Sequence, residues 1–324
     1  MEQNEVLKAL RRDHAAELKL AAERLKGTAR HTEIIPSPVL SEMTGHEILL
    51  KPENLQVTGS FKIRGAYNKI ASLSDEQLAH GIVTASAGNH AQGVAYAARE
   101  RGAKATICMP QITPPLKVDA TKAYGADVVL CGEVFDESAA HAQELSDTEG
   151  MIYVPPFDDY EVLCGQGTIG LEILEDVPNV TDVVVPLGGG GLGAGVALAI
   201  KTFNPEVRVI GAIPEGSPAW KNSFAAGRVT EADQVVTSAE GVAVKYPGDL
   251  PFALLNEFIA LLKETSVAGY VGIMDLTKAG DLIRGRTFSA FMPLIAVALV
   301  YLIIVMLLTS LVGQLERRLR KSER

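Results

Sequence analysis

A lysine follows a tight turn in the first candidate site of this 324-residue chain, where Thr58, Gly59 and Ser60 lead into Phe61 and Lys62. The apolar pattern predicts a helix from residue 61, so the amine of Lys62 lies at the positive end of a helix dipole. A positive potential disfavours the charged amine and favours a nucleophilic lysine that forms Schiff bases. An ordinary exposed lysine in the first turn of a helix is the alternative interpretation.

The second candidate site is a turn between a predicted strand and a predicted helix. It consists of Ser86, Ala87, Gly88, Asn89 and His90. Backbone N–H groups at a helix start, together with an amide side chain, suit a carboxylate or a ring hydroxyl. A simple helix cap by Ser86 or Asn89 competes with this interpretation.

Four consecutive glycines form the third candidate site, in which Gly188, Gly189, Gly190 and Gly191 precede Leu192. Glycines between an apolar strand and an Ala-rich helix lower stability, so we expect them where the backbone approaches a ligand. The pattern is neither a P-loop nor a dinucleotide turn, which leaves a phosphate site of another kind. A lysine, an anion turn and a phosphate site together predict a phosphorylated aldehyde cofactor.

Alternating strands and helices must position these three turns. Predicted strands cover residues 47–51, 82–86, 105–109, 127–130, 152–154, 182–185 and 207–212, and predicted helices cover 61–73, 90–101, 135–145 and 192–203. Such alternation indicates an α/β fold with a mostly parallel sheet. Ligands of these sheets bind at the carboxyl ends of the strands, where all three turns lie.

Composition excludes several classes of protein. With 47% hydrophobic and 21% charged residues, the chain can form a large core and about two domains. A net charge of −9 without a basic stripe argues against nucleic acid as a partner. Cys108, Cys131 and Cys164 show neither a disulfide framework nor zinc-ligand spacing, and the histidines outside the turns, His141 among them, are scattered. We therefore predict a reducing compartment and no metal.

The motifs resemble one enzyme family closely. The segments 51–56 and 59–66, then 86–93, then 188–192 are similar to the biosynthetic threonine dehydratase branch of the fold-type II pyridoxal phosphate enzymes. The resemblance covers residues 15–250 and implies doubly wound sheets, with a small domain at about 75–155 inserted into a truncated large domain. It also implies pyridoxal 5'-phosphate as cofactor and suggests a homo-oligomer.

The resemblance assigns roles to the three turns. Lys62 would hold the cofactor as a Schiff base and then remove the substrate Cα proton, and Phe61 would pack beside the ring. Asn89 would bond to the ring hydroxyl, and the turn Ser86, Ala87, Gly88, Asn89 and His90 would hold the substrate carboxylate. The glycines 188–191 and Leu192 would cradle the phosphate. His90 is expected to shape the turn rather than to move protons.

The implied reaction is β-elimination of L-threonine to 2-oxobutanoate and ammonia, with L-serine to pyruvate as a related activity. Serine racemases of this family carry a serine where this chain has Ala87, so elimination is favoured over racemisation. Relatives that bind a divalent cation carry a glutamate at the position of Ile213, so no metal is predicted by this route either.

The family pattern breaks near Leu250, and no Ser-Gly-Gly turn for the pyridine nitrogen occurs in the chain. Residues 251–324 resemble the C-terminal end of a polar amino acid ABC transporter permease. This part holds 9 basic and 6 acidic residues, and residues 287–315 carry no charge. A transmembrane helix is predicted at about 289–313, followed by a basic flank that belongs on the cytoplasmic side. The catalytic region is then cytoplasmic, with the C-terminal segment in the plasma (inner) membrane.

Three hypotheses follow. The chain is a threonine dehydratase held at the membrane by its tail, or a non-catalytic chimera whose C-terminal part is a permease remnant, or a protein that takes up cofactor without turnover. A natural fusion, an assembly error and a deliberate chimera all fit a junction near residue 250.

Overall fold

A computed structural model describes residues 3–265 of the chain, and residues up to Leu261 form one compact unit. The unit begins with α1 (Gln3–Leu10), α2 (His14–Leu25) and α3 (Pro38–Thr44). Its later helices are α4 (Lys62–Ala71), α5 (Asp75–Ala79), α6 (Asn89–Glu100), α7 (Pro115–Lys122), α8 (Phe135–Glu149), α9 (Tyr160–Asp176), α10 (Gly191–Phe203) and α11 (Ala219–Ala226). The short 3-10 helices are η1 (Glu53–Leu55) and η2 (Glu240–Val242).

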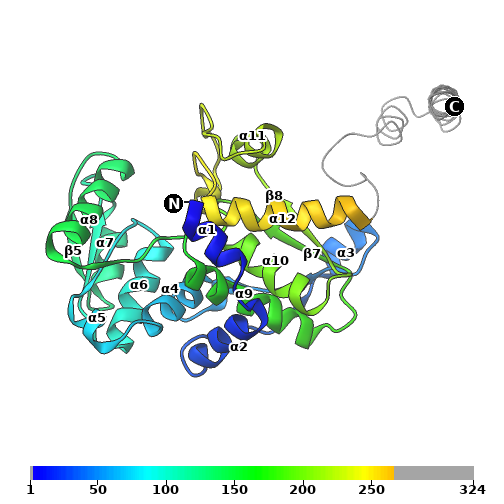
Figure 1. Cartoon of the computed structure of the whole chain (residues 1–324), viewed down its shortest axis with the longest axis horizontal. Coiled ribbons are helices and arrows are strands. Elements are labelled where there is room, and N and C mark those ends of the chain that lie inside the picture. The colour runs from blue at the N-terminus through cyan, green and yellow to red at the C-terminus, as the bar shows by residue number, and fades with distance from the viewer. Residues whose placement is uncertain (1–2, 266–324) are drawn as a thin grey trace, which may run out of the picture. The chain divides into compact units, whose positions relative to one another are not determined.

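A four-stranded parallel sheet forms one part of the unit. It contains β3 (Ile82–Ala85), β4 (Ala105–Met109), β5 (Asp127–Leu130) and β6 (Ile152–Tyr153) in the order β5-β4-β3-β6. The two faces of the sheet belong to separate clusters of apolar side chains. One contains Ile107 and the α6 residue Val94, and the other contains Val83 and the α8 residue Ala142. Figure 1 shows the sheet with its helices at one end of the unit.

A second parallel pair, β7 (Asp182–Pro186) and β8 (Arg208–Ala212), lies at the other end (Figure 1). Val183 and Val185 of β7 pack with Ile200 of α10 and Ile169 of α9. α9 and α10 approach closely because glycines face each other, and a Cβ on Gly195 would meet Leu163 and, at 2.9 Å, the backbone of Gly167. The glycine loop leads from β7 into α10.

The predicted strands and helices between residues 61 and 212 are confirmed, and α5, α7 and α9 are additional helices in this range. The strand predicted at 47–51 shortens to β2 (Leu49–Leu50), which pairs antiparallel with β1 (Ile35–Pro36) outside both parallel sheets. α9 was not predicted as a helix. Its glycines at 165, 167 and 170 weaken the helical signal of the sequence, whereas the packing against α10 requires them.

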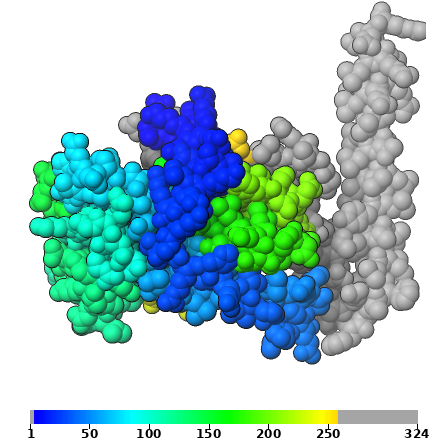
Figure 2. Space-filling view, turned by 90° about the horizontal axis from the view of Figure 1, so that it is seen from below, coloured from blue at the N-terminus to red at the C-terminus, as the bar shows by residue number. Residues whose placement is uncertain are grey.

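α1 and α2 cover the junction between the two parts of the unit. Figure 2 shows these helices in dark blue between the cyan-to-green segments and the green segment. Leu18 and Ala21 of α2 are fully buried, and α2 contacts α4, α9 and α10. The charged N-terminal stretch is therefore helical and has an apolar face toward the core.

α12 (Asp249–Thr265) begins at the predicted junction near residue 250. Leu250 and Leu254 are buried in the same cluster as Leu18, and Phe252 packs on Trp220. The first turns of α12 thus belong to the core of the α/β unit. The membrane helix predicted at 289–313, and the permease-like part beyond residue 265, lie outside the described residues. Within residues 3–265, no helix is long and apolar enough to cross a membrane.

A buried ion cluster around Arg64 fixes α4 in place. Arg64 is 1% exposed, and its guanidinium donates to both oxygens of Glu53 at 2.8 Å and to the Glu172 carboxylate on α9. It also donates to Thr168 Oγ1 at 3.1 Å and to the Arg30 carbonyl at 2.9 Å. Burial alone would lower the pKa of Arg64, but the hydrogen bonds that it donates to Glu53 and Glu172, together with their negative charges, outweigh burial and raise it.

We expect Arg64→Met to lower the free energy of unfolding by about 3–5 kcal/mol, because two largely buried carboxylates lose their guanidinium. Urea unfolding monitored by circular dichroism measures the change. Lys26→Met is the control, because Lys26 pairs with Glu23 at the surface, and its loss is worth at most about 1 kcal/mol. Equal effects of the two substitutions would contradict the role given to the cluster.

Candidate active site

Lys62 is the first residue of α4. Its side chain turns inward, where Nζ donates a hydrogen bond to the Pro156 carbonyl at 2.6 Å. Nζ also lies 5.5 Å from the centre of the Phe61 ring. Burial lowers the pKa of the amine to about 8. The lowered pKa expected from the sequence is therefore present, but desolvation causes it rather than the helix dipole.

The turn at residues 86–90 joins β3 to α6 beside Lys62. A Cβ on Gly93, in the first turns of α6, would lie 3.2 Å from the backbone of Lys62, so a larger residue there would push the two helices slightly apart. The backbone N–H of Ser86 donates to the Cys108 carbonyl at 3.1 Å, and the Ser86 hydroxyl accepts from the Gly88 N–H at 3.2 Å. Asn89 is exposed at the start of α6.

The free N–H groups of this turn suit an anion. In α6 the first bonded N–H is that of Gln92, which donates to the Gly88 carbonyl at 3.4 Å. Among residues 3–265, the N–H groups of Ala87, Asn89, His90 and Ala91 have no hydrogen-bond partner. Four such groups at a helix start form a site for a carboxylate.

His90 is held as a neutral ring. Its Nε2 lies 3.0 Å from the Val154 carbonyl, and because a carbonyl only accepts, Nε2 carries the proton. Burial, and then the nearby charge of Lys62, lower the pKa of His90 to about 3. Nδ1 is therefore an acceptor, and it is buried without a partner in the described part of the chain. The ring shapes the turn, and it also presents an unpaired nitrogen.

The carbonyl groups of the glycine loop accept hydrogen bonds from neighbouring residues. Gly188 O accepts from Trp220 Nε1 at 2.6 Å, and Gly189 O accepts from the Gly248 N–H at 2.9 Å. The first bonded N–H of α10 is that of Ala194, which donates to Gly190 O at 2.8 Å. The N–H groups of residues 188–193 have no partner among the residues that the structure describes. Residues 188–191 are buried.

A run of buried, unpaired N–H groups at a helix start calls for an anion. Glycines are needed here because a Cβ on Gly189 would overlap the Phe157 ring, and one on Gly190 would overlap Trp220. Gly190 also has φ of +101°, which side chains rarely adopt. Leu192, the last residue predicted for this loop, is half-buried at the start of α10.

The loop that follows β6 connects the three turns, and sequence reasoning did not single it out. Val154 O pairs with His90, Pro156 O accepts from Lys62, and the next residue, Phe157, packs on the glycine loop. The sequence shows here only the pair Pro155 and Pro156, which is typical of a turn. Its carbonyl groups carry no signal in the side-chain pattern.

These groups fit pyridoxal phosphate. Lys62 offers a buried amine of lowered pKa for the aldehyde, and the unpaired N–H groups of residues 188–193 offer partners for the phosphate. The N–H groups at the start of α6 remain for a carboxylate. The amide of Asn89 is placed on the same turn, and its predicted bond to a ring hydroxyl stays a prediction.

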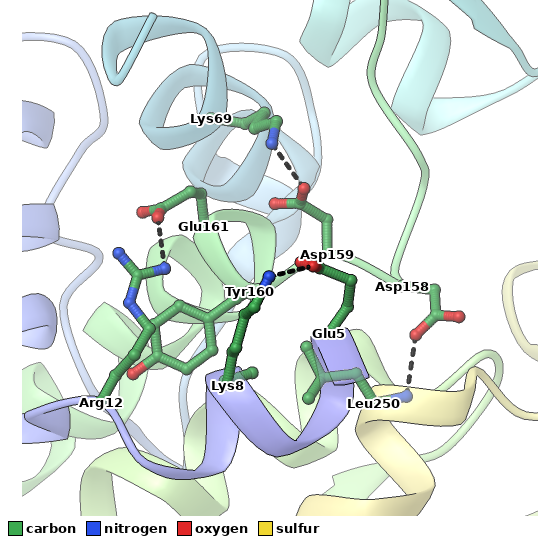
Figure 3. Close-up of a pocket in the computed structure, with 10 residues that line it drawn as sticks. Glu5, Lys8, Arg12, Lys69, Asp158, Asp159, Tyr160, Glu161 and Leu250 are labelled. Atoms are coloured by element: carbon green, nitrogen blue, oxygen red, sulfur yellow. Dashed lines mark hydrogen bonds and ion pairs between the residues drawn. The ribbon is translucent and has the colours of Figure 1, made fainter. Parts of the chain in front are cut away.

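A separate cavity of about 460 Å³ lies away from these turns, between α1 and the start of α9 (Figure 3). Its charged side chains are paired with one another: Lys69 with Asp159 at 2.6 Å, Arg12 with Glu161 at 2.8 Å and Lys8 with Glu5 at 2.7 Å. Asp158 accepts from the Leu250 N–H at 2.9 Å and so caps α12. None of the predicted catalytic residues lines it.

Solved structures share the fold. The processed form of threonine deaminase isoform 2 from Solanum lycopersicum superposes with a TM-score of 0.73 at 41% identity, covering 79% of this chain and 73% of that one. Maize serine racemase gives a TM-score of 0.73 at 35% identity, covering 75% and 74%.

Curated proteins of similar sequence belong to the same group of enzymes as these structures. Over 243 residues the chain is 52% identical to the L-threonine ammonia-lyase of Thermotoga maritima, covering 75% of this chain and 61% of that protein. Over 253 residues it is 48% identical to the catabolic L-threonine dehydratase TdcB of Staphylococcus aureus strain N315, covering 76% and 73%. The chain therefore spans less than two thirds of the length of the Thermotoga maritima relative.

A family model described as pyridoxal-phosphate dependent enzyme matches residues 25–271. The match includes all three turns and continues past the predicted junction at residue 250. It also includes α12 as far as the structure describes that helix. Since the model covers most of the chain, and the lysine and the anion sites suit its cofactor, the chain belongs to the family of pyridoxal-phosphate-dependent enzymes.

Proposed function

We propose that this chain converts L-threonine to 2-oxobutanoate and ammonia, by loss of water followed by hydrolysis, with L-serine as a second substrate that gives pyruvate and ammonia. The observation that carries the proposal is a buried amine of lowered pKa, that of Lys62, bonded to the same loop that contacts His90 and the glycine loop. The relatives named L-threonine ammonia-lyase and L-threonine dehydratase support the choice of substrate.

The chain's own residues supply binding and proton transfer. Pyridoxal phosphate, when bound, withdraws electrons from the substrate α-carbon. The N–H groups at the start of α6 hold the substrate carboxylate, and those of residues 188–193 hold the phosphate. The amine of Lys62 would hold the cofactor through its aldehyde, and as a free neutral amine it would accept the Cα proton of the substrate. Its lowered pKa keeps a useful fraction neutral near pH 7.

Elimination is favoured over racemisation because Ala87 provides no proton donor on the turn. Racemisation needs a second acid on the opposite side of the α-carbon. On this turn, the only ring proton of the neutral His90 is on Nε2, which donates it to the Val154 carbonyl. The β-hydroxyl of threonine leaves as water with the aid of a proton, and hydrolysis then releases ammonia.

We expect Lys62→Ala to reduce 2-oxobutanoate formation from L-threonine by at least about 100-fold, because it removes the proton-transferring amine. The product is measured by chromatography with added pyridoxal phosphate. Borohydride reduction followed by mass spectrometry should place the cofactor on Lys62 of the wild type.

Lys69→Ala is the matched control, since this lysine lies on the same helix and pairs with Asp159. It should leave product formation within a few-fold of the wild type. Cofactor on Lys62 without any 2-oxobutanoate would contradict the dehydratase proposal and favour a protein that binds cofactor without turnover.

The rate at which apoprotein captures pyridoxal phosphate should depend on pH. Only the neutral amine attacks an aldehyde, and the pKa of Lys62 is lowered to about 8, so the rate should rise with pH and level off above pH 8. With an ordinary lysine, the capture rate would continue to rise up to about pH 10.4. Stopped-flow absorbance measures the rate, and a continued rise through pH 10 would show that the amine is not buried.

For the C-terminal region we propose attachment to the plasma membrane through residues 289–313, with the catalytic part on the cytoplasmic side. Support comes from the sequence alone, namely the uncharged stretch 287–315 and its basic flank. The permease-like part is then an anchor.

We expect the full chain to remain with membranes after carbonate extraction. Introducing Leu302→Arg and Leu307→Arg together should release it, because each charge near the centre of a span costs about 2.5–3.5 kcal/mol. Immunoblotting of the fractions measures the distribution. Recovery of the unmodified chain in the supernatant would contradict the anchor.

A further inference from the structure

Two of the three cysteines and one histidine meet on the outer side of the four-stranded sheet. Cys108 lies in β4, Cys131 directly follows β5, and His141 is on α8. Each offers one ligand atom, and the three atoms lie within 4.8 Å of one another. No interaction in the proposed reaction uses these side chains.

The topology explains how the residues meet. In the parallel pair β4–β5, Cys108 lies opposite Val129, and side chains two residues apart on a strand share a face. Cys131 therefore points to the same side of the sheet as Cys108. α8 covers this side, since Ala142, next to His141, packs in the same cluster. The sequence spacings of 23 and 10 residues give no sign of it.

The atoms suit a thiophilic metal. Zinc binds thiolate sulfur at about 2.3 Å and imidazole nitrogen at about 2.0–2.1 Å, so ligand atoms of a tetrahedral site lie about 3.5–3.8 Å apart. The two sulfur atoms and the imidazole nitrogen would therefore have to approach one another by about 1 Å to bind a zinc ion. Cys108 is fully buried, whereas the side chain of His141 is 36% exposed, so solvent reaches the group from the side of α8.

The surroundings of His141 resemble those of a metal ligand. Glu144, one turn further along α8, contacts Nδ1 of the ring at 3.2 Å. A carboxylate partner of this kind orients a ligating imidazole and raises its basicity. Buried thiols alone pack as small apolar groups, but an imidazole with its carboxylate at the same point is not needed for packing.

We propose that Cys108, Cys131 and His141 bind one Zn²⁺ ion, with water in the fourth position and Glu144 orienting the imidazole. The ion would join the ends of β4 and β5 to α8. Burial and the neighbouring Cys131 raise the pKa of the Cys108 thiol to about 12, so zinc must displace thiol protons on binding. The site is independent of the proposed reaction, because its ligands touch neither Lys62 nor the glycine loop among the described contacts.

The test uses the full chain, freed of metal and kept reduced, and titrated with Co²⁺ as a coloured probe for Zn²⁺. We expect one equivalent to bind, with a near-ultraviolet thiolate-to-cobalt band that Zn²⁺ abolishes. Cys131→Ser and His141→Ala, both in partly exposed positions, should each weaken binding by at least tenfold. Glu144→Gln should weaken it by about 10–100-fold.

Cys164→Ser and His80→Ala are matched controls, because Cys164 is on α9 and His80 follows α5, both outside the cluster. Both should bind like the wild type, and circular dichroism should show every variant to be folded. The proposal is overturned if the wild type shows no thiolate band although its thiols are reduced. It is equally overturned if Cys131→Ser and His141→Ala bind the probe like the wild type.

Discussion

The ion pairs of the buried Arg64 guanidinium are the interaction on which the position of Lys62 depends. Arg64 lies two residues after Lys62 and joins α4 to η1 through Glu53 and to α9 through Glu172. Each charge in this cluster is deprived of water, so each needs the others, and the helix cannot shift without exposing an unpaired charge in the core. The start of α4 is thus fixed before any ligand binds.

Backbone carbonyl groups of one loop then position several elements of the site. The loop after β6 offers one carbonyl to His90 and another to Lys62, and the following residues contact the glycine loop and cap α12. Four elements far apart in sequence therefore converge on about five residues of irregular chain. Because a carbonyl accepts but never donates, these contacts place the ring proton of His90 on Nε2 and hold the lysine amine inside the protein.

The two ligand sites consist of backbone N–H groups that have no hydrogen-bond partner among the described residues. The carbonyl groups of the glycine loop are bonded to Trp220 and Gly248, whereas its buried N–H groups find no partner within residues 3–265. The start of α6 shows a similar set of free N–H groups. Buried unpaired donors lower stability, so the buried N–H groups of the glycine loop indicate that an anionic ligand completes the structure there.

The sequence by itself determined the alternation of strands and helices and the three turns, because these depend on local periodicity, turn residues and short motifs. It also predicted Lys62 as the reactive lysine. Only the tertiary structure decided the sheet order, the partner of Lys62 at Pro156, the ion cluster of Arg64 and the meeting of Cys108, Cys131 and His141. α9 also escaped prediction, since its glycines serve packing against α10. Pairings between distant residues depend on how the elements pack, and that information is not contained in any single stretch of chain.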